Sequence, residues 1–276
     1  MVTERLMSDL SKNAVDANQR LNNSLRLLAK WRSELIKNTI LQNNGTKVLD
    51  GPVKGLDFLE KSAEGCHVAK LLGCYEQPLH EKLTGVLNGN YDKIINIGSA
   101  EGYYAVGLAV AAPEVVSLAY DIDLNAQAAC DELASRNGVS DRVMIGGEFK
   151  NEDFQHHTDG SVLVLCDIEG AEAELLDPSL APALKAMDLI VESHECLKEG
   201  VTEELIKRFS ETHDIELIED NGGRDLSNAP SWFTRLSHLD QLLATWEWRS
   251  GPTPWLSMTA KHDSNYRLQA TRLFNG

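Results

Sequence analysis

Apolar residues in the middle of the chain form short runs that are separated by helical patterns. Six runs have the length and composition of strands: 92–97, 115–120, 142–146, 161–166, 187–192 and 214–219. Helical patterns lie between them: 103–112, 124–137, parts of 171–186, and 201–212. The run Val162-Leu163-Val164-Leu165 does not alternate with polar residues, which is typical of a strand buried on both faces. This order predicts an α/β fold with a doubly wound, mainly parallel sheet.

Residues 3–42 predict one long helix, because neither proline nor glycine occurs before Gly45. Apolar or small residues recur there in steps of four and three: Leu10, Ala14, Ala17, Leu21, Ser24, Leu28, Trp31 and Leu35. This spacing is that of a heptad seam. It predicts either self-association, most simply a homodimer, or the packing of an amphipathic helix on its own domain.

Glycines and a proline interrupt the pattern after this helix, at Gly51-Pro52, Gly55 and Gly65. We therefore expect an N-terminal helical arm with its connector at 1–65 and a larger domain at 66–276.

Segment 221–254 is long for a connection between two strands, and it contains a helical pattern near 232–246. Four of the five tryptophans lie between 232 and 255. The segment is either a lid or substrate wall, or an insertion that the tryptophans merely anchor.

Composition excludes several classes of protein. Hydrophobic residues make up 42% of the 276, which is ample for a core. No apolar run approaches the ~18 residues of a membrane span, and the first residues lack the pattern of a signal peptide, so we expect no membrane association. The five cysteines are odd in number and contain no C-x-x-C pair. They favour reduced thiols in a cytoplasmic protein without a zinc site.

The charge is strongly acidic but unevenly spread. The formal net charge is −16 at pH 7. Residues 1–50 hold eight Lys and Arg against five Asp and Glu, a net of +3, so the remainder carries −19. A body this acidic repels polyphosphate, and we therefore expect no nucleic-acid partner.

The most informative segment is 94–104, where an apolar run ends in a small-residue turn and a helical pattern follows at once. A strand, a tight loop and a helix start are the arrangement in which backbone amides meet a cofactor. The next predicted strand ends at Asp121, which lies 19 residues after Gly102. A carboxylate there can accept hydrogen bonds from both ribose hydroxyls of an adenosine ligand.

Three cofactor classes compete for this loop. A nicotinamide fingerprint requires glycine where Ala100 stands and a small residue where Tyr103 stands. A phosphate-binding P-loop requires Gly-Lys-Ser/Thr, and the chain has no such tripeptide. The remaining class is S-adenosylmethionine, which carries no phosphate and tolerates the bulky residue.

These residues resemble class I S-adenosylmethionine-dependent methyltransferases, and most closely the FkbM-type branch. The resemblance spans roughly 70–220 and lies in four motifs: Gly98 through Tyr103, Asp121, Asp167-Ile168-Glu169-Gly170-Ala171-Glu172, and Val191-Glu192-Ser193-His194. It implies a seven-stranded sheet with an antiparallel last strand at 255–260. Asn96 stands where the family usually has an acid. Residues 1–65 and 221–276 show no such resemblance, so the methyl acceptor does not follow from it.

The carboxyl ends of parallel strands meet at one edge of a sheet, which brings the predicted loops together. The loops and the resemblance predict these cofactor-binding residues: Glu76, Asn96, Gly98, Ser99, Ala100, Gly102, Tyr103, Asp121, Ile122, Glu148, Phe149 and Asp167. Glu148 is either a partner of the adenine amino group, with Phe149 against the ring, or a simply exposed acid. Glu76 either reaches the methionine end of the cofactor or begins a helix.

Methyl transfer is an in-line displacement at a sulfonium carbon, so the protein mainly orients the reactants and removes the acceptor's proton. The expected catalytic residues are Asp167, Glu169, Glu192 and His194. His194 is the expected base because histidine titrates near neutrality, although a purely structural histidine is an equal alternative. The same groups offer ligands for a divalent cation, but we favour a site without metal, in which the acids cap a helix and hold a turn.

We therefore expect a methyltransferase that acts on a small molecule. The resemblance implies O-methylation of a sugar or secondary metabolite. The alternative is a non-catalytic module that binds S-adenosylmethionine or S-adenosylhomocysteine within a helix-mediated assembly.

Overall fold

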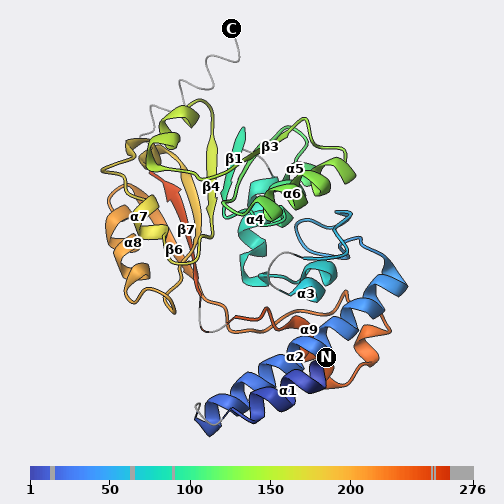
Figure 1. The fold of residues 1–276 in the computed structure, drawn as a ribbon. Coiled ribbons are helices and arrows are strands. Elements are labelled where there is room, and N and C mark those ends of the chain that lie inside the picture. Colours follow the sequence, from blue (N-terminus) through green and yellow to red (C-terminus); the bar gives the residue numbers. More distant parts are fainter. Residues whose placement is uncertain (13–15, 63–65, 89–90, 250, 252, 262–276) are drawn as a thin grey trace. The chain divides into compact units, whose positions relative to one another are not determined.

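The computed structural model describes residues 1–12, 16–62, 66–88, 91–249, 251 and 253–261. The chain packs into two compact units, each formed by two stretches of sequence (Figure 1). Unit 1 comprises Met1–Gln77 and Gly222–Arg249, and unit 2 comprises Pro78–Asn221 and Ser250–Gly276.

A seven-stranded sheet forms the centre of unit 2, in the spatial order β3-β2-β1-β4-β5-β7-β6. Its strands are β1 (Lys93–Ile97), β2 (Val116–Tyr120), β3 (Val143–Gly146), β4 (Val162–Cys166), β5 (Asp188–Glu192), β6 (His213–Ile218) and β7 (Trp255–Ala260). The first five strands pair in parallel, and β7 runs antiparallel between β5 and β6. The predicted strands, including the antiparallel seventh, are thus confirmed to within one residue at either end.

Helices connect the strands of unit 2. They are α5 (Tyr103–Ala111), α6 (Leu124–Arg136), α7 (Glu172–Leu175) and α8 (Val201–Phe209), with the 3-10 helices η2 (Asn151–His157) and η3 (Pro182–Ala186). Before β1 lie α4 (His80–Leu87) and the 3-10 helix η1 (Gln77–Leu79), which begins at the last residue of unit 1. The strand order reverses between β1 and β4. Because crossovers between parallel strands are almost always right-handed, this reversal puts helices on both faces of the sheet. The predicted doubly wound architecture is confirmed.

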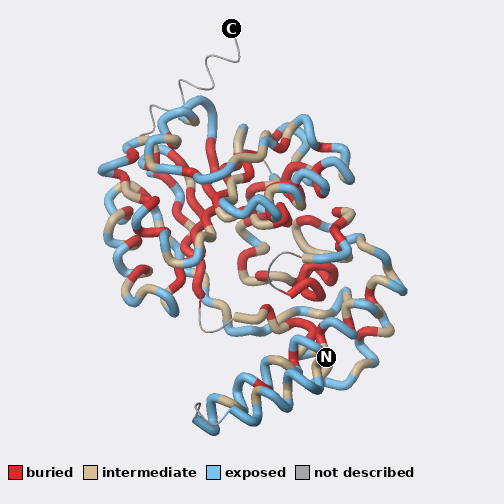
Figure 2. The backbone as a smooth tube through the Cα atoms, viewed as in Figure 1, coloured by how far each residue is buried: buried red, intermediate tan, exposed pale blue. Residues whose placement is uncertain are grey.

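The core of unit 2 lies between the sheet and these helices (Figure 2). All five residues of β4 are buried, as expected for a strand covered on both faces. In α8, Val201, Leu205 and Phe209 are buried at steps of four residues, so one face of the helix packs against the sheet.

Unit 1 contains α1 (Val2–Leu10), α2 (Ala17–Asn44), α3 (His67–Leu72), η4 (Phe233–Arg235) and α9 (His238–Thr245). The prediction of one helix over 3–42 is wrong, because the structure has two helices there. Asp16 is the N-cap of α2, and its carboxylate accepts hydrogen bonds from the backbone N–H groups of Asn18 (2.9 Å) and Gln19 (3.3 Å). This cap favours a new helix start over continuation of α1.

The face by which α2 packs in unit 1 is not the predicted seam. The buried residues of α2 are Ser24, Ala29, Ser33, Ile36 and Ile40. Of the seam, Ser24 is buried, whereas four larger members are exposed by 39–60%: Leu21, Leu28, Trp31 and Leu35. Self-association through this exposed part of the seam stays a prediction.

Segment 222–249 packs against the N-terminal helices of unit 1. Arg32 on α2 makes two hydrogen bonds to the Asp240 carboxylate, at 2.6 and 2.9 Å. Trp232 Nε1 donates to Asn44 Oδ1 at 2.9 Å, so this tryptophan anchors the segment.

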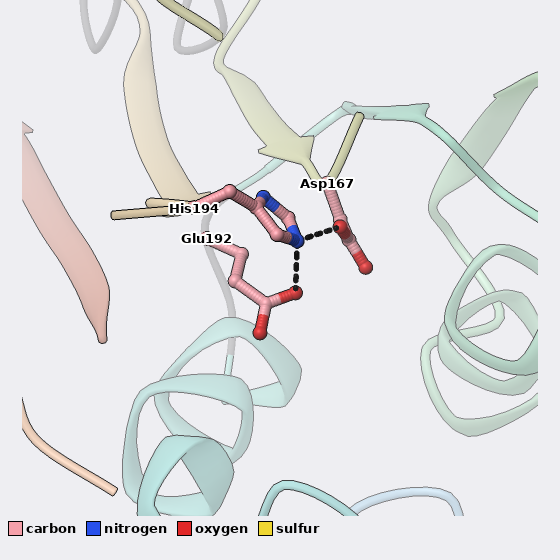
Figure 3. A group of neighbouring side chains, drawn as sticks. All are labelled: Asp167, Glu192 and His194. Atoms are coloured by element: carbon pink, nitrogen blue, oxygen red, sulfur yellow. Dashed lines mark ion pairs between the residues drawn. The ribbon is translucent and has the colours of Figure 1, made fainter. Parts of the chain in front are cut away.

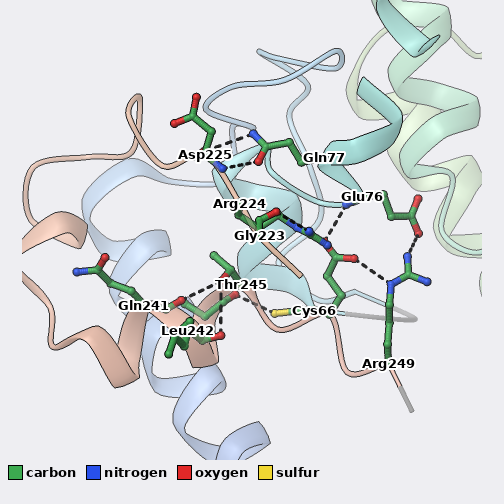
Figure 4. A network of polar contacts seen from close by, with 12 residues as sticks. Cys66, Glu76, Gln77, Gly223, Arg224, Asp225, Gln241, Leu242, Thr245 and Arg249 are labelled. Carbon is green, nitrogen blue, oxygen red and sulfur yellow. Dashed lines mark hydrogen bonds and ion pairs between the residues drawn. The ribbon is translucent and has the colours of Figure 1, made fainter. Parts of the chain in front are cut away.

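A buried network of charges also holds the segment (Figure 4). Arg224 and Arg249 both bind the Glu247 carboxylate, with closest N–O distances of 2.6 and 3.2 Å. Arg249 further pairs with Glu76 at 2.9 Å, and the backbone N–H of Glu76 donates to Glu247 Oε1. Residues about 170 positions apart in the sequence are thereby joined.

Unit 1 thus includes α3, the residues up to Gln77 and segment 222–249, whereas the sequence suggested an N-terminal arm and connector at 1–65. Two residues named above, Ala14 and Gly65, lie outside the described residues. All five cysteines are free, as expected from their spacing. The described helices include none whose length and hydropathy would suit a membrane-spanning segment.

Candidate functional site

The loop after β1 turns sharply and passes very close to the end of β4. Gly98, Ala100 and Gly102 have positive φ angles of 76°, 46° and 86°. A Cβ atom on Gly98 would lie 1.6 Å from the backbone oxygen of Asp167, so only glycine fits there. The backbone N–H of Asp167 in turn donates to the oxygen of Ile97 at 2.9 Å. The predicted cofactor loop and the predicted catalytic aspartate are therefore neighbours.

Asp121 fastens the same loop to the end of β2. Its Oδ2 accepts a hydrogen bond from the backbone N–H of Ala100 at 2.8 Å, and its Oδ1 accepts one from Asp123 at 2.8 Å. The N–H groups of Gly98 and Ser99 both donate to the oxygen of Tyr120. The protein's own groups thus hold the loop, and each Asp121 oxygen keeps a further lone pair.

Two buried polar atoms at this loop have no hydrogen-bond partner among the described residues: Asn96 Oδ1 and Ser99 Oγ. Buried polar groups are nearly always satisfied in folded proteins. A ligand with hydrogen-bonding groups at this position would satisfy them, as the amino-acid end of S-adenosylmethionine can. Ile122, next to Asp121, is 80% exposed and offers an apolar surface beside a carboxylate that suits a ribose.

Other predicted cofactor residues of unit 2 lie in different surroundings. The Phe149 ring is enclosed in the core, with its centroid 4.7 Å from that of Tyr120 and 4.8 Å from that of Phe154. Glu148 is exposed and lies 3.4 Å from Lys150 Nζ. Tyr103 is buried at the start of α5. Their roles toward the cofactor stay predictions.

Glu76 lies in unit 1, where its carboxylate is committed to the ion pair with Arg249. The sequence could not show this partner, which follows 173 residues later.

An imidazole and two carboxylates meet at the carboxyl ends of β4 and β5 (Figure 3). His194 Nε2 lies 3.5 Å from Asp167 Oδ1 and 3.6 Å from Glu192 Oε2. The side chains of His194 and Glu192 are buried, whereas that of Asp167 is 31% exposed. The structure therefore brings three of the four predicted catalytic residues together, with Asp167 on the accessible side.

The fourth predicted catalytic residue, Glu169, is exposed in the turn after β4, where its φ angle is +56°. It lies outside this trio but contributes negative charge near His194.

The other ring nitrogen of His194 is held from behind by Glu172, the first residue of α7. Nδ1 lies 2.6 Å from Glu172 Oε1, and the Glu172 side chain is fully buried. Glu172 lies in the fourth-strand motif named above, but no role was predicted for it. Its position five residues after Asp167 was the available signal, but only the fold shows that it meets His194.

Opposing effects act on the pKa of each partner. Burial alone would lower the pKa of His194, but the hydrogen bond to Glu172 and the charges of Glu192 and Glu169 raise it above its usual value. Burial alone would raise the pKa of Glu172, but its hydrogen bonds with His194 and the Gly170 backbone lower it. The hydrogen bond between them thus acts on the two pKa values in opposite directions, raising that of His194 and lowering that of Glu172.

One atom each from Asp167, Glu192 and His194 lie within 4.8 Å of one another. Carboxylate oxygens and an imidazole nitrogen are ligands that divalent cations accept. These are the residues that could hold a metal, although the sequence favoured a site without one.

Neither a protein-family model nor a curated protein matches the chain. Among solved structures, a human methyltransferase 10 domain containing protein aligns with 85% of this chain and 97% of its own, at 11% identity and a TM-score of 0.50. The O-methyltransferase TomG from Streptomyces achromogenes, solved with S-adenosylmethionine, aligns with 67% of this chain and 79% of its own (15% identity, TM-score 0.41).

A methyltransferase from Geobacter sulfurreducens, solved with S-adenosyl-L-homocysteine, aligns with 68% of this chain and 92% of its own (10% identity, TM-score 0.44). The alignment with the human protein and the strand order, with its antiparallel β7, show that the chain has the Rossmann-like fold of class I methyltransferases.

Proposed function

We propose that unit 2 is an S-adenosylmethionine-dependent methyltransferase of the FkbM type that methylates an oxygen of a small molecule, such as a sugar or secondary metabolite. The observation that carries this proposal is the junction at Gly98. There the loop that suits the cofactor lies against Asp167, the accessible member of the group that suits proton removal. Cofactor loop and candidate base thus share one edge of the sheet.

The residues at the loop after β1 have hydrogen-bonding and apolar groups that suit the parts of S-adenosylmethionine. Asp121 would accept hydrogen bonds from the ribose, and Ile122 would contact the adenine. Asn96 Oδ1 and Ser99 Oγ are buried acceptors without described partners, on the side that suits the amino-acid end. When bound, S-adenosylmethionine supplies an electrophilic methyl group.

The chain's own contribution is to place the acceptor and remove its proton. As the acceptor oxygen bonds to the methyl carbon and the sulfur–carbon bond breaks, the hydroxyl proton passes to His194 Nε2. Asp167 and Glu192 flank that nitrogen at 3.5 and 3.6 Å, so their charges stabilise the imidazolium that forms. The products are the methylated acceptor and the demethylated cofactor.

The acidity of the chain supports a small, non-polyanionic acceptor. The formal net charge of −16 disfavours nucleic acids and other polyphosphates. We infer that the reaction needs no metal, because His194 then keeps Nε2 free for the proton. Treatment with a chelator should leave both cofactor binding and turnover unchanged.

The alternative is a module that binds the cofactor without catalysis. His194→Ala and Asp167→Ala separate the two functions in an assay of methyl transfer to a panel of hydroxylated small molecules. The proposal predicts that His194→Ala lowers kcat by about 10²–10⁴-fold, the usual contribution of a general base. His156→Ala, at an exposed histidine of η2, is the matched control and should keep parental activity.

A parent protein that binds S-adenosylmethionine but methylates no acceptor in the panel favours the binding module. Full activity of the His194→Ala variant would contradict the proposal that His194 is the general base.

A further inference from the structure

Glu172 is a charged side chain with no access to water. It begins α7 and is fully buried, and burial of a carboxylate is costly unless charged or hydrogen-bonding partners compensate. The fold nevertheless retains it directly behind the imidazole of His194. The contacts of the Glu172 carboxylate should therefore show why the fold keeps it buried.

Both described hydrogen bonds of Glu172 fall on one oxygen. Oε1 lies 2.6 Å from His194 Nδ1 and accepts the backbone N–H of Gly170 at 3.0 Å. Gly170 and Glu169 have φ angles of 100° and 56°, so the turn after β4 has the unusual backbone that directs this N–H at the carboxylate. The position of Oε1 is therefore fixed by the backbone as well as by the ring.

A carboxylate can only accept hydrogen bonds, so Nδ1 must carry the proton that joins it to Glu172. In the neutral ring this leaves the lone pair on Nε2, the nitrogen that faces Asp167 and Glu192 (Figure 3). The groups around the imidazole are thus Glu172 from α7, Asp167 after β4, Glu192 from β5 and Glu169 from the turn. Of these, only Glu172 lies within 3 Å of the ring nitrogens in the described contacts.

We propose that Glu172 is a positioning residue for methyl transfer: it fixes the orientation and the tautomer of His194, so that Nε2 is the atom that takes the acceptor's proton. This inference rests on the proposed function. The proton leaves the acceptor hydroxyl as its oxygen bonds to the methyl carbon, and the sulfur keeps the electron pair of the broken bond. The resulting imidazolium keeps its Nδ1–H bond to Glu172.

The test compares Glu172→Gln with Glu172→Asp and with Glu174→Gln. The glutamine is similar in size, but its amide can donate to Nδ1 as well as accept from it, so it no longer dictates the tautomer. The Glu172→Asp variant retains the carboxylate on a side chain that is shorter by one methylene group. Glu174 lies on the same helix but is exposed and pairs with Lys198, which makes it the matched control.

The first readout is the ¹⁵N NMR spectrum of the imidazole nitrogens in chelator-treated protein, with His194→Ala used to assign the signals. The parent should show Nδ1 protonated, and Glu172→Gln should show a population with the proton on Nε2. Glu172→Asp should keep the parental tautomer. An Nδ1 that is unprotonated in the parent overturns the inference, whether or not any variant folds.

The second readout is steady-state kinetics. Glu172→Gln should lower kcat by about 10²-fold with KM changed less than about twofold, Glu172→Asp should recover part of that loss, and Glu174→Gln should match the parent. Unchanged kcat in a folded Glu172→Gln protein also overturns the inference. A parent that neither binds S-adenosylmethionine nor transfers methyl groups contradicts the proposed function instead, and the NMR spectrum still decides whether Glu172 sets the tautomer.

Discussion

At the scale of single residues, Gly98 has no room for a side chain. Its Gly98→Ala variant would bring a methyl group within 1.6 Å of the Asp167 backbone oxygen and strain a φ angle of 76°. We expect at least a tenfold loss of S-adenosylmethionine affinity, measured by calorimetry. Gly85→Ala in α4, where nothing lies within 4 Å, is the control and should bind like the parent. Equal affinity in both variants contradicts this account of the loop.

The pH dependence of turnover follows from the surroundings of His194. Burial alone would lower the pKa of the ring, but Glu172, Glu192 and Glu169 together raise it above the usual value. Because the proposed base must be neutral, kcat should fall as pH decreases through a pKa on the alkaline side of ordinary histidine. Removing the Glu172 charge in Glu172→Gln should move this inflection to lower pH. A pH profile without an inflection in this range contradicts the assignment.

Gly98 and Asp121 could be singled out from the sequence because each directly follows an apolar strand pattern. The structure shows why glycine stands at 98 and that Asp121 accepts a hydrogen bond from the same loop. Their roles toward the cofactor stay predictions. The partners of Glu76 and Glu172, which are Arg249 and His194, could not be predicted, because 173 and 22 residues separate the members of each pair. Such pairings depend on the tertiary fold and leave no local pattern.

At the scale of elements, the parallel strands were predictable because each is a short apolar run between helical patterns. The break between α1 and α2 was not, since apolar spacing continues across it and only the capping geometry of Asp16 marks the new helix. The sequence also did not show that α9 belongs to unit 1, because its contacts, such as the Arg32–Asp240 pair, join residues about 200 positions apart.

The charge network of unit 1 should be essential for its stability. The side chains of Arg224 and Glu247 are only 3% and 2% exposed. Glu247→Gln would leave the buried Arg224 guanidinium without its Glu247 partner and would also break the pair with Arg249, which is 19% exposed and keeps Glu76. We expect a cost of about 3–5 kcal/mol in the free energy of unfolding. Four tryptophans, Trp31, Trp232, Trp246 and Trp248, lie in unit 1, so tryptophan fluorescence during urea unfolding reports mainly on this unit.

Glu34→Gln, at an exposed pair with Lys37 in the same unit, is the control and should cost about 0–1 kcal/mol. A Glu247→Gln protein as stable as Glu34→Gln would show that the network is dispensable.

The exposed part of the α2 seam predicts self-association. Leu21, Leu28 and Leu35 recur every seven residues and are 60%, 39% and 40% exposed. Replacing all three with Gln should convert an oligomeric parent into a monomer in sedimentation velocity experiments. The matched control replaces three exposed leucines of unit 2, Leu180, Leu197 and Leu217, and should leave the oligomeric state unchanged. A monomeric parent contradicts the prediction.

At the scale of the whole molecule, the fold class followed from the order of strands and helices, which also suggested the edge of the sheet where the candidate site lies. The division into units did not, because the chain leaves unit 1 after Gln77 and returns to it at Gly222. Local sequence patterns cannot show contacts between segments that are separated by more than 140 residues, as these two segments of unit 1 are. Local patterns therefore predicted unit 2 accurately and unit 1 only in part.

The central claim is that unit 2 binds S-adenosylmethionine through the loop after β1. The most direct test is calorimetric titration of the purified chain with S-adenosylmethionine, before and after chelator treatment, with NAD as a control ligand. Asp121→Asn tests the loop, and Asp131→Asn, at an exposed position of α6, is the matched control. The account predicts micromolar binding of S-adenosylmethionine alone, unaffected by the chelator, weakened at least tenfold in Asp121→Asn and unchanged in Asp131→Asn. Absence of binding with and without divalent metal, or equal binding of NAD, would contradict it.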